Sequence, residues 1–230
     1  MGLKQLILVN DVETDQDRKG LIVGSRDVPA STQGLKDSVV VAQKVMDTVK
    51  NVDCILCSDL ARVSRILHHL RVNAKYRVIV KITDSLRERD MGVLNCNSMK
   101  MVGGFQSDLF QHSRICAEGG ETIAQCSERI TSTIKSYLSK YDGTIVAVSH
   151  SLACNIAFNS LLGRSVTEVY PFWLKKGSYA IMTMEDDLSP WLTFQEAFNV
   201  LDNRPYSIRD IEDEFNEVSN ISSPSTQEDS

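Results

Sequence analysis

The sequence predicts an α/β fold, a three-layer sandwich in which helices cover both faces of a mostly parallel central sheet. Five short apolar runs, rich in branched residues, have the length and composition of buried strands. Longer stretches with helical character separate them, and this alternation is typical of parallel sheets covered by helices. The apolar runs are Leu6–Val9, Cys54–Cys57, Val78–Ile82, Ile145–Val148 and Tyr179–Met184.

Four stretches between these runs predict helices. The third of them follows Gly119 and Gly120, carries Glu121 in its first turn and ends near Gly143. The segment from about Cys96 to Glu118 has weak periodicity and several glycines and serines, which indicates a long insertion loop or a small cap. The expected helices are Gln33–Lys50, Leu60–Arg71, Glu121–Lys140 and Ser151–Leu162.

The last thirty residues differ from the rest, so we divide the chain into a domain at residues 1–200 and a C-terminal segment at 201–230. This segment carries eight acids and two arginines, a charge of −6 that is larger in magnitude than the −5 of the whole chain. From about Tyr206 to Val218, apolar residues recur on one helical face, which predicts an acidic helix before a disordered Ser/Pro-rich tail. We expect this helix to bind a partner protein, with docking on its own domain as the alternative.

Composition and charge exclude several classes of function. A net charge of −5 gives no electrostatic reason to expect nucleic acid or an anionic membrane as a partner. No apolar run approaches the ~20 residues of a membrane helix. No secretory signal is visible, so the six cysteines are expected to be reduced, in the cytoplasm or the nucleus. Cys54 and Cys57 form a C-x-x-C pair inside a strand, which favours core packing over a redox or metal site. No metal and no cofactor are predicted.

Polar side chains follow four of the predicted strands. Asn10 and Asp11 come after the first strand, Arg62 after the second, Glu88 after the third and His150 after the fourth. Each of them has an ordinary explanation on its own, as a helix cap, a surface cation or a solvated acid. Ligands bind at the carboxyl ends of the strands in a doubly wound sheet, so the four positions together predict one site.

The order of these residues, with the motifs around them, resembles the histidine phosphatase superfamily, whose fold is phosphoglycerate-mutase-like. That family reads R-H-G-E-T after its first strand, S-D-L-x-R after its second, L-R-E-x-x-x-G after its third and S-H after its fourth. It also has a G-x-x-D-x-P-L-T-x-x-G stretch and a G-G-E-S/T helix start. The corresponding segments here, within a match from about Leu6 to Met184, are Asn10–Thr14, Ser58–Arg62, Leu86–Gly92, Ser149–His150, Gly24–Gly34 (one residue longer) and Gly119–Thr122.

The resemblance implies phosphoryl transfer through a phosphohistidine. In that mechanism two arginines and a second histidine neutralise the phosphate, and a carboxylic acid protonates the leaving oxygen. Arg62, His150 and Glu88 match the second arginine, the second histidine and the acid. The first motif departs from the pattern, because Asn10 stands where the first arginine belongs and Asp11 where the nucleophile belongs.

These departures predict loss of the family's catalysis. Asp11 lacks the imidazole nitrogen that forms the N–P bond, and loss of a nucleophile commonly costs about 10⁴ to 10⁶ in rate. Asn10 removes a bidentate phosphate clamp. Val12 adds a branched side chain where a glycine allows close approach of the backbone. We therefore predict that Asp11 pairs with Arg62 and replaces the charge of the lost ligand.

Three functions remain open at this point. The favoured one is a pseudoenzyme (a pseudophosphatase), which acts as a scaffold for protein interaction. The second is a phosphohydrolase of the phosphatase or phosphoglycerate mutase type with altered chemistry, in which Asp11 is an aspartyl nucleophile. The third is a module that binds a small metabolite through Arg62 and His150. The oligomeric state and the identity of a partner are not predicted.

Overall fold

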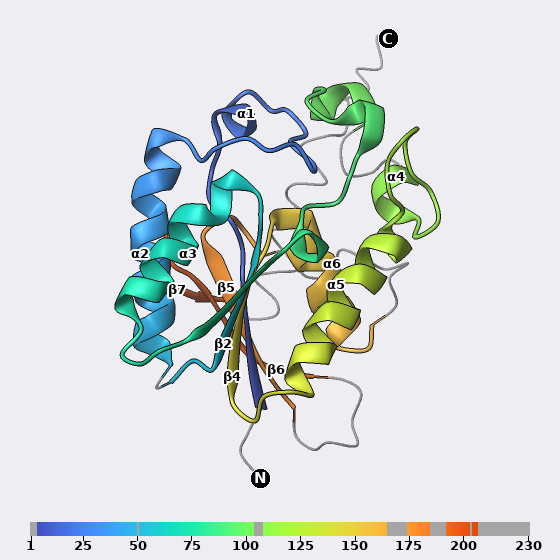
Figure 1. Cartoon of the computed structure of the whole chain (residues 1–230). Helices are drawn as coiled ribbons and strands as arrows, with labels where there is room; N and C mark the ends of the chain where they lie inside the picture. Colours follow the sequence, from blue (N-terminus) through green and yellow to red (C-terminus); the bar gives the residue numbers. More distant parts are fainter. Residues whose placement is uncertain are drawn as a thin grey trace, which may run out of the picture.

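A single mixed sheet runs through the middle of the molecule (Figure 1). The structure is a computed structural model, and it describes residues 4–49, 51–103, 108–164, 174–184 and 192–202, with the backbone of 204–206. The seven strands lie in the order β3-β2-β4-β1-β5-β6-β7. Their bounds are β1 Lys4–Val9, β2 Cys54–Ser58, β3 Ile79–Thr83, β4 Thr144–Val148, β5 Ser178–Met184, β6 Thr193–Asn199 and β7 Arg204–Tyr206.

The five predicted strands are all present. β3, β2, β4 and β1 pair in parallel, whereas β5 pairs antiparallel with β1. β6 pairs antiparallel with β5, and β7 with β6, so five of the seven strands point the same way. The mostly parallel sheet expected from the sequence is confirmed. β6 and β7 were not predicted, and β7 continues the sheet beyond residue 200.

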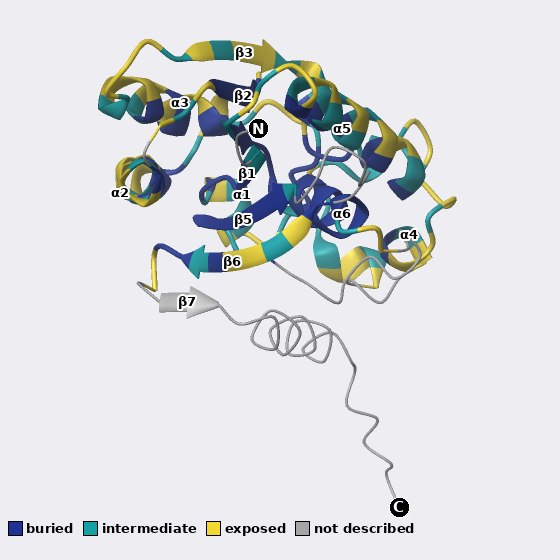
Figure 2. Ribbon diagram, turned by 90° about the horizontal axis from the view of Figure 1, so that it is seen from below, coloured by how far each residue is buried: buried dark blue, intermediate teal, exposed yellow. Residues whose placement is uncertain are grey.

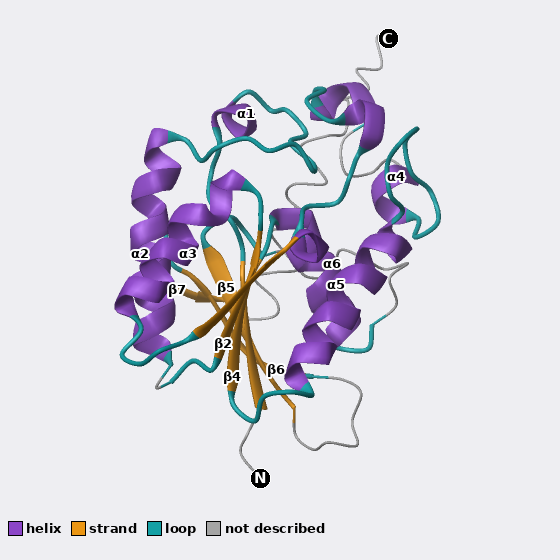
Figure 3. Cartoon of the chain, in the orientation of Figure 1, coloured by secondary structure: helices purple, strands orange, loops and turns teal. Residues whose placement is uncertain are grey.

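Two pairs of helices cover the two faces of the sheet (Figure 3). On one side lie α2 (Thr32–Thr48) and α3 (Ala61–Asn73), and on the other lie α5 (Ile123–Leu138) and α6 (Ser151–Leu161). These are the four expected helices, with ends that differ by a few residues. Thr122 forms a capping box with Gln125, and this places the start of α5 at Ile123, two residues after the expected Glu121.

The alternation of side chains along the strands explains the two helical layers. Leu6 and Leu8 of β1 face the cluster that contains α5 and α6, whereas Ile7 and Val9 face the cluster that contains α2 and α3. The central strands are therefore buried on both faces, as Figure 2 shows. α6 is also enclosed, since every residue from Leu152 to Leu161 is buried. β3 forms one edge of the sheet and is largely exposed.

Short elements and loops gather at the carboxyl ends of the parallel strands (Figure 1). They are α1 (Asp15–Arg18), α4 (Asp108–Gln111) and three 3₁₀ helices, which span Asp84–Leu86, Gly92–Leu94 and Met99–Val102. The insertion expected from about Cys96 to Glu118 contains the last of these 3₁₀ helices and α4, so it forms a small cap where it is described. Gly34 in α2 lets the helix approach the loop after β1, because a Cβ there would lie 2.3 Å from the carbonyl oxygen of Glu13.

Other expectations concern the cysteines and the C-terminus. Cys54 and Cys57 are fully buried in β2, and burial raises their thiol pKa values to about 11 and about 12, as expected for core packing. Among the described helices, none is long and apolar enough to cross a membrane. Tyr206 ends β7, and the rest of the helix expected up to Val218 lies outside the described residues.

Candidate functional site

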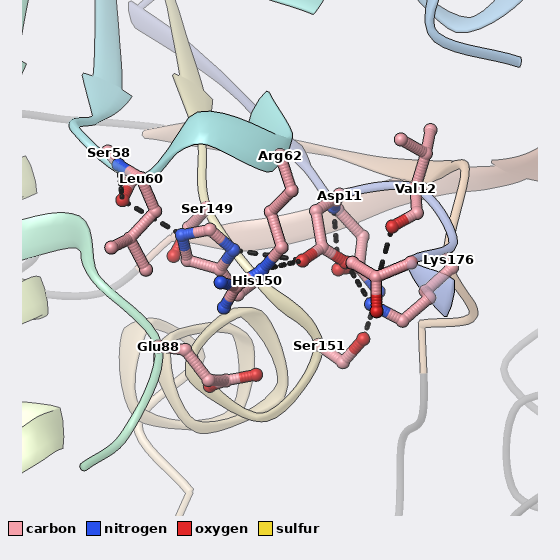
Figure 4. Close-up of polar contacts among 12 residues, drawn as sticks. Asp11, Val12, Ser58, Leu60, Arg62, Glu88, Ser149, His150, Ser151 and Lys176 are labelled. Carbon is pink, nitrogen blue, oxygen red and sulfur yellow. Dashed lines mark hydrogen bonds and ion pairs between the residues drawn. The ribbon is translucent and has the colours of Figure 1, made fainter. Parts of the chain in front are cut away.

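The predicted site lies at the carboxyl ends of β1, β2 and β4 (Figure 4). Asn10 and Asp11 follow β1, and His150 follows β4 and precedes α6. Arg62 is in the first turn of α3, directly after β2. Asp11, Arg62 and His150 are all buried, with relative exposures of 0 to 1%. The parallel strands therefore bring together residues that are far apart in the sequence.

Asp11 is the centre of a network of hydrogen bonds and ion pairs. Its Oδ2 accepts a hydrogen bond from Arg62 Nε at 2.8 Å and lies 2.9 Å from His150 Nδ1. Its Oδ1 accepts a hydrogen bond from Lys176 Nζ at 2.6 Å. The predicted pairing of Asp11 with Arg62 is thus present, and a second cation adds to it.

Each of the three guanidinium nitrogens of Arg62 already donates to a partner within the protein, which uses three of its five N–H groups. Its Nη1 donates to the carbonyl of Arg26 at 2.9 Å, and its Nη2 donates to the carbonyl of Gly24 at 3.0 Å. The same loop is held from the other side, because the carboxylate of Asp27 accepts the backbone N–H of Ala61 at the start of α3. The guanidinium therefore joins the loop at 24–27 to Asp11.

His150 is held as a neutral imidazole. Burial and the charge of Arg62 lower its pKa to about 3, although Asp11 acts in the opposite direction. A neutral ring satisfies both contacts when Nδ1 donates to Asp11 and Nε2 accepts from the hydroxyl of Ser58, which lies 2.8 Å away. His150 thus supplies a hydrogen bond and no positive charge.

Lys176 is a member of the site that the sequence analysis missed. It lies just before β5, and its Nζ also lies 3.4 Å from Asp17 Oδ2. Burial lowers the pKa of Lys176, but Asp11 and Asp17 outweigh this effect and the pKa is raised. Two adjacent lysines precede Gly177, and nothing in that pattern indicates which one points inward.

Asn10 has a different role from the one expected in a phosphate pocket. Its Nδ2 donates to the carbonyl of Leu174 at 2.8 Å, and its Oδ1 accepts the backbone N–H of Asp11. The Oδ1 of Asn155 in α6 accepts the N–H of Leu174 at 2.8 Å. The two asparagines hold Leu174 from both sides, so Asn10 positions the segment that delivers Lys176.

The pKa of Asp11 reflects the balance of these contacts. Burial by itself would raise the pKa of the carboxyl group. The charge of Lys176, the hydrogen bond from His150 and the charge of Arg62 outweigh burial and hold the pKa well below its ordinary value. Asp11 is therefore an ionised, buried carboxylate whose two oxygens both have donors.

Glu88 lies close to this network without joining it. Its carboxylate accepts backbone N–H groups from Arg89, Leu152 and Ala153 at 2.7 to 3.0 Å, so it binds the N-terminus of α6. Burial raises the pKa of Glu88 even though the charge of Arg62 opposes this shift. In Figure 4 no dashed line joins Glu88 to Asp11 or Arg62.

A pocket opens beside this network. Its volume is about 180 Å³, and it is lined by Asp11, Arg62, Glu88 and Lys176 together with mostly apolar residues. Asn10 and His150 are not among the lining residues. In the part of the chain that the structure describes, no group of three or more His, Cys, Asp or Glu residues is placed to hold a metal ion.

Comparisons with known proteins identify the family. A sequence model of the histidine phosphatase superfamily (branch 1) matches residues 6–196. The chain belongs to this superfamily. It is 25% identical to phosphoserine phosphatase 1 of Hydrogenobacter thermophilus, over 79% of this chain and 87% of that protein. It is 24% identical to a 2,3-bisphosphoglycerate-dependent phosphoglycerate mutase of Mesorhizobium japonicum, over 80% of this chain and 94% of that protein.

The fold is also found among solved structures. A mycobacterial glucosyl-3-phosphoglycerate phosphatase superposes with a TM-score of 0.73 and 16% identity, over 84% of this chain and 96% of that one. This likeness shows the fold and not the activity. The phosphoglycerate-mutase-like fold is therefore confirmed, and the chain has a phosphatase and a mutase among its relatives.

Proposed function

We propose that this protein does not transfer phosphoryl groups through a phosphohistidine, and that its pocket is a non-catalytic derivative of the family's site. The observation that supports this is the network around Asp11. An aspartate stands at the position that the resemblance assigns to the nucleophile. Its carboxylate makes hydrogen bonds with Arg62, His150 and Lys176, and a negative charge therefore occupies the place of a bound anion.

The charge of Asp11 opposes the entry of phosphate. A phosphate within about 4 Å of an ionised carboxylate is repelled by about 4 kcal/mol per unit charge at an effective dielectric near 20. Arg62 offers at most two N–H groups in return, because three of its five already donate to Asp11 and to the carbonyls of Gly24 and Arg26. Lys176 is able to turn to an anion only by leaving Asp11 and Asp17.

The second candidate is a phosphohydrolase with altered chemistry, and the comparisons favour it, because the named relatives are a phosphatase and a phosphoglycerate mutase. In this mechanism Asp11 is the nucleophile, and Lys176 supplies the charge that Asn10 lacks. Glu88, whose pKa is raised, protonates the leaving oxygen. Against it, both oxygens of Asp11 already accept hydrogen bonds, which lowers their nucleophilicity.

The role as a protein-interaction scaffold stays a prediction. It depends on the segment from about Tyr206 to Val218, and residues 207–230 lie outside those described. Location in the cytoplasm or nucleus likewise stays a prediction.

Turnover assays separate the two candidates. The purified full chain is incubated with p-nitrophenyl phosphate, phosphoserine and phosphoglycerates, with and without Mg²⁺. We expect turnover far below about 1 s⁻¹, the low end for ordinary enzymes, on every substrate. Turnover above that value that is lost in Asp11→Ala, and retained when the exposed Asp15 is changed to Ala, would establish the phosphohydrolase instead.

A further inference from the structure

The pocket beside Asp11 has the size of a site for a small organic molecule. Its volume of about 180 Å³ is comparable with a cavity of roughly 150 Å³ that accepts benzene in another protein. Its walls come from separate parts of the chain, namely the loop after α1, the 3₁₀ helix Met99–Val102, α4 and the start of α6. A pocket with walls from several elements presents a shaped surface to a ligand and not a flat one.

The walls are predominantly apolar. Met91 and Phe110 are buried, with relative exposures of 2% and 1%, and Met99 is partly buried against the same core cluster. Methionine side chains adapt to the shape of a ligand and make favourable contacts with aromatic rings. The apolar side chains in the walls are Leu21, Ile22, Val23, Met91, Met99, Phe110 and Leu152.

Every cation that lines this pocket already has partners inside the protein. Arg62 and Lys176 contact Asp11. Arg89 is fully buried and directs its guanidinium to the backbone carbonyls of Glu121, Leu109 and Ile115. An anionic ligand therefore competes with Asp11 for Arg62 and Lys176 and with backbone carbonyls for Arg89.

Three acids also line the pocket, and two of them, Asp17 and Glu88, retain acceptor capacity. Asp17 caps α1 through Thr14 and lies near Lys176. Glu88 accepts three backbone N–H groups, and a carboxylate has about four acceptor sites. The third is Asp11. These carboxylates repel an anion but accept a hydrogen bond from a hydroxyl or N–H group.

We propose that this pocket binds an uncharged small molecule of about the size of phenol, with an apolar or aromatic body and one hydrogen-bond donor, and that it excludes phosphorylated compounds. The inference rests on the proposed function, since it requires that Asp11 occupies the anion site. The apolar walls supply the binding free energy, and the acceptors of Asp17 and Glu88 orient the donor.

The probe for this proposal is 4-fluorophenol, observed by ¹⁹F NMR with the full chain. We expect saturable binding, with amide shifts in ¹⁵N spectra of the wild type confined to residues around the pocket. Met99→Glu places a charge in the wall and lowers affinity by about tenfold or more, the effect of about 1.4 kcal/mol. Met101→Glu is the matched control, because Met101 lies in the same 3₁₀ helix and is 79% exposed. The control variant keeps the wild-type affinity.

Inorganic phosphate as a competitor distinguishes the ways in which the proposal fails. We expect that phosphate does not displace 4-fluorophenol. If phosphate displaces it and shifts the amides around Asp11, the anion site is open and this inference is wrong, whereas the proposed function fails only if the turnover assays find activity that is lost in Asp11→Ala. If neither probe binds, or if 4-fluorophenol shifts residues away from the pocket, this inference alone is overturned. The wild-type shift map decides between these outcomes even if Met99→Glu does not fold.

Discussion

Removal of the charge of Asp11 tests whether this carboxylate stabilises the site from within. Asp11→Asn keeps the size of the side chain but leaves Arg62 without its counter-ion and Lys176 with Asp17 alone. Loss of one partner of a buried ion pair costs about 3–5 kcal/mol. The side chain of Lys176 is 26% exposed and has Asp17 nearby, so it is able to turn toward water, whereas that of Arg62 is 2% exposed. We therefore expect the free energy of unfolding to fall by about 3 kcal/mol, the lower end of this range.

Calorimetry and urea denaturation measure this change. A loss of 3 kcal/mol corresponds to a fall in Tm of about 6–12 °C for a domain of this size. The variant also exposes an anion site, so sulfate or phosphate restores stability, by about 2.7 kcal/mol at a concentration one hundred times its Kd. Asp15→Asn, at an exposed acid of α1, is the control and shows neither effect. The reasoning is refuted if Asp11→Asn is as stable as the wild type and gains no stability from either anion.

Three further predictions concern the residues around Asp11. Lys176→Met lowers the free energy of unfolding by about 1–3 kcal/mol, because it leaves the buried carboxylate of Asp11 one donor short. Lys36→Met, at an exposed position, is the control and changes the free energy of unfolding by less than about 0.5 kcal/mol. Equal effects of the two substitutions in urea denaturation contradict the role of Lys176. Because the pKa of His150 is lowered to about 3, the unfolded chain binds an extra proton below about pH 6.5, so the free energy of unfolding falls as the pH drops toward 4, by up to about 1.4 kcal/mol per pH unit. The raised pKa of Glu88 acts in the opposite direction. His150→Asn removes the His150 contribution, so an unchanged slope in a pH series of denaturation curves, compared with the wild type, counts against the neutral imidazole. Asn10→Ala leaves the Leu174 carbonyl without its donor and lowers the free energy of unfolding by about 1–3 kcal/mol. An unchanged denaturation midpoint contradicts the role of Asn10 in holding Leu174.

The sequence was sufficient for most of the fold, because the buried strands are marked by strong local patterns. β1, β2 and β4 are apolar on both faces, and such runs stand out in a chain with 24% charged residues. β6 has no such mark. Its sequence is TFQEAFN, and its burial is irregular because it lies near the edge of the sheet. β7 is only three residues long.

The site was predictable only in part, and for a physical reason. Residues such as Arg62 and His150 follow strands, and the order of strands in a parallel sheet brings their ends together. Lys176 precedes an antiparallel strand, and its approach to Asp11 depends on how Asn10 and Asn155 hold Leu174. Such side-chain contacts between distant segments have no periodicity that a single sequence displays.

A search for a phosphorylated protein intermediate tests the central claim most directly. The full chain is mixed with ³²P-labelled phosphoserine, quenched within milliseconds to seconds, and examined for label bound to the protein. Phosphohistidine is labile in acid, and an aspartyl phosphate is cleaved by hydroxylamine, so the two adducts are distinguishable. The account predicts no label on the protein, neither one that acid removes nor one that hydroxylamine removes. Acid-labile label would contradict it by showing phosphohistidine chemistry, and hydroxylamine-sensitive label that is absent in Asp11→Asn would establish Asp11 as a nucleophile.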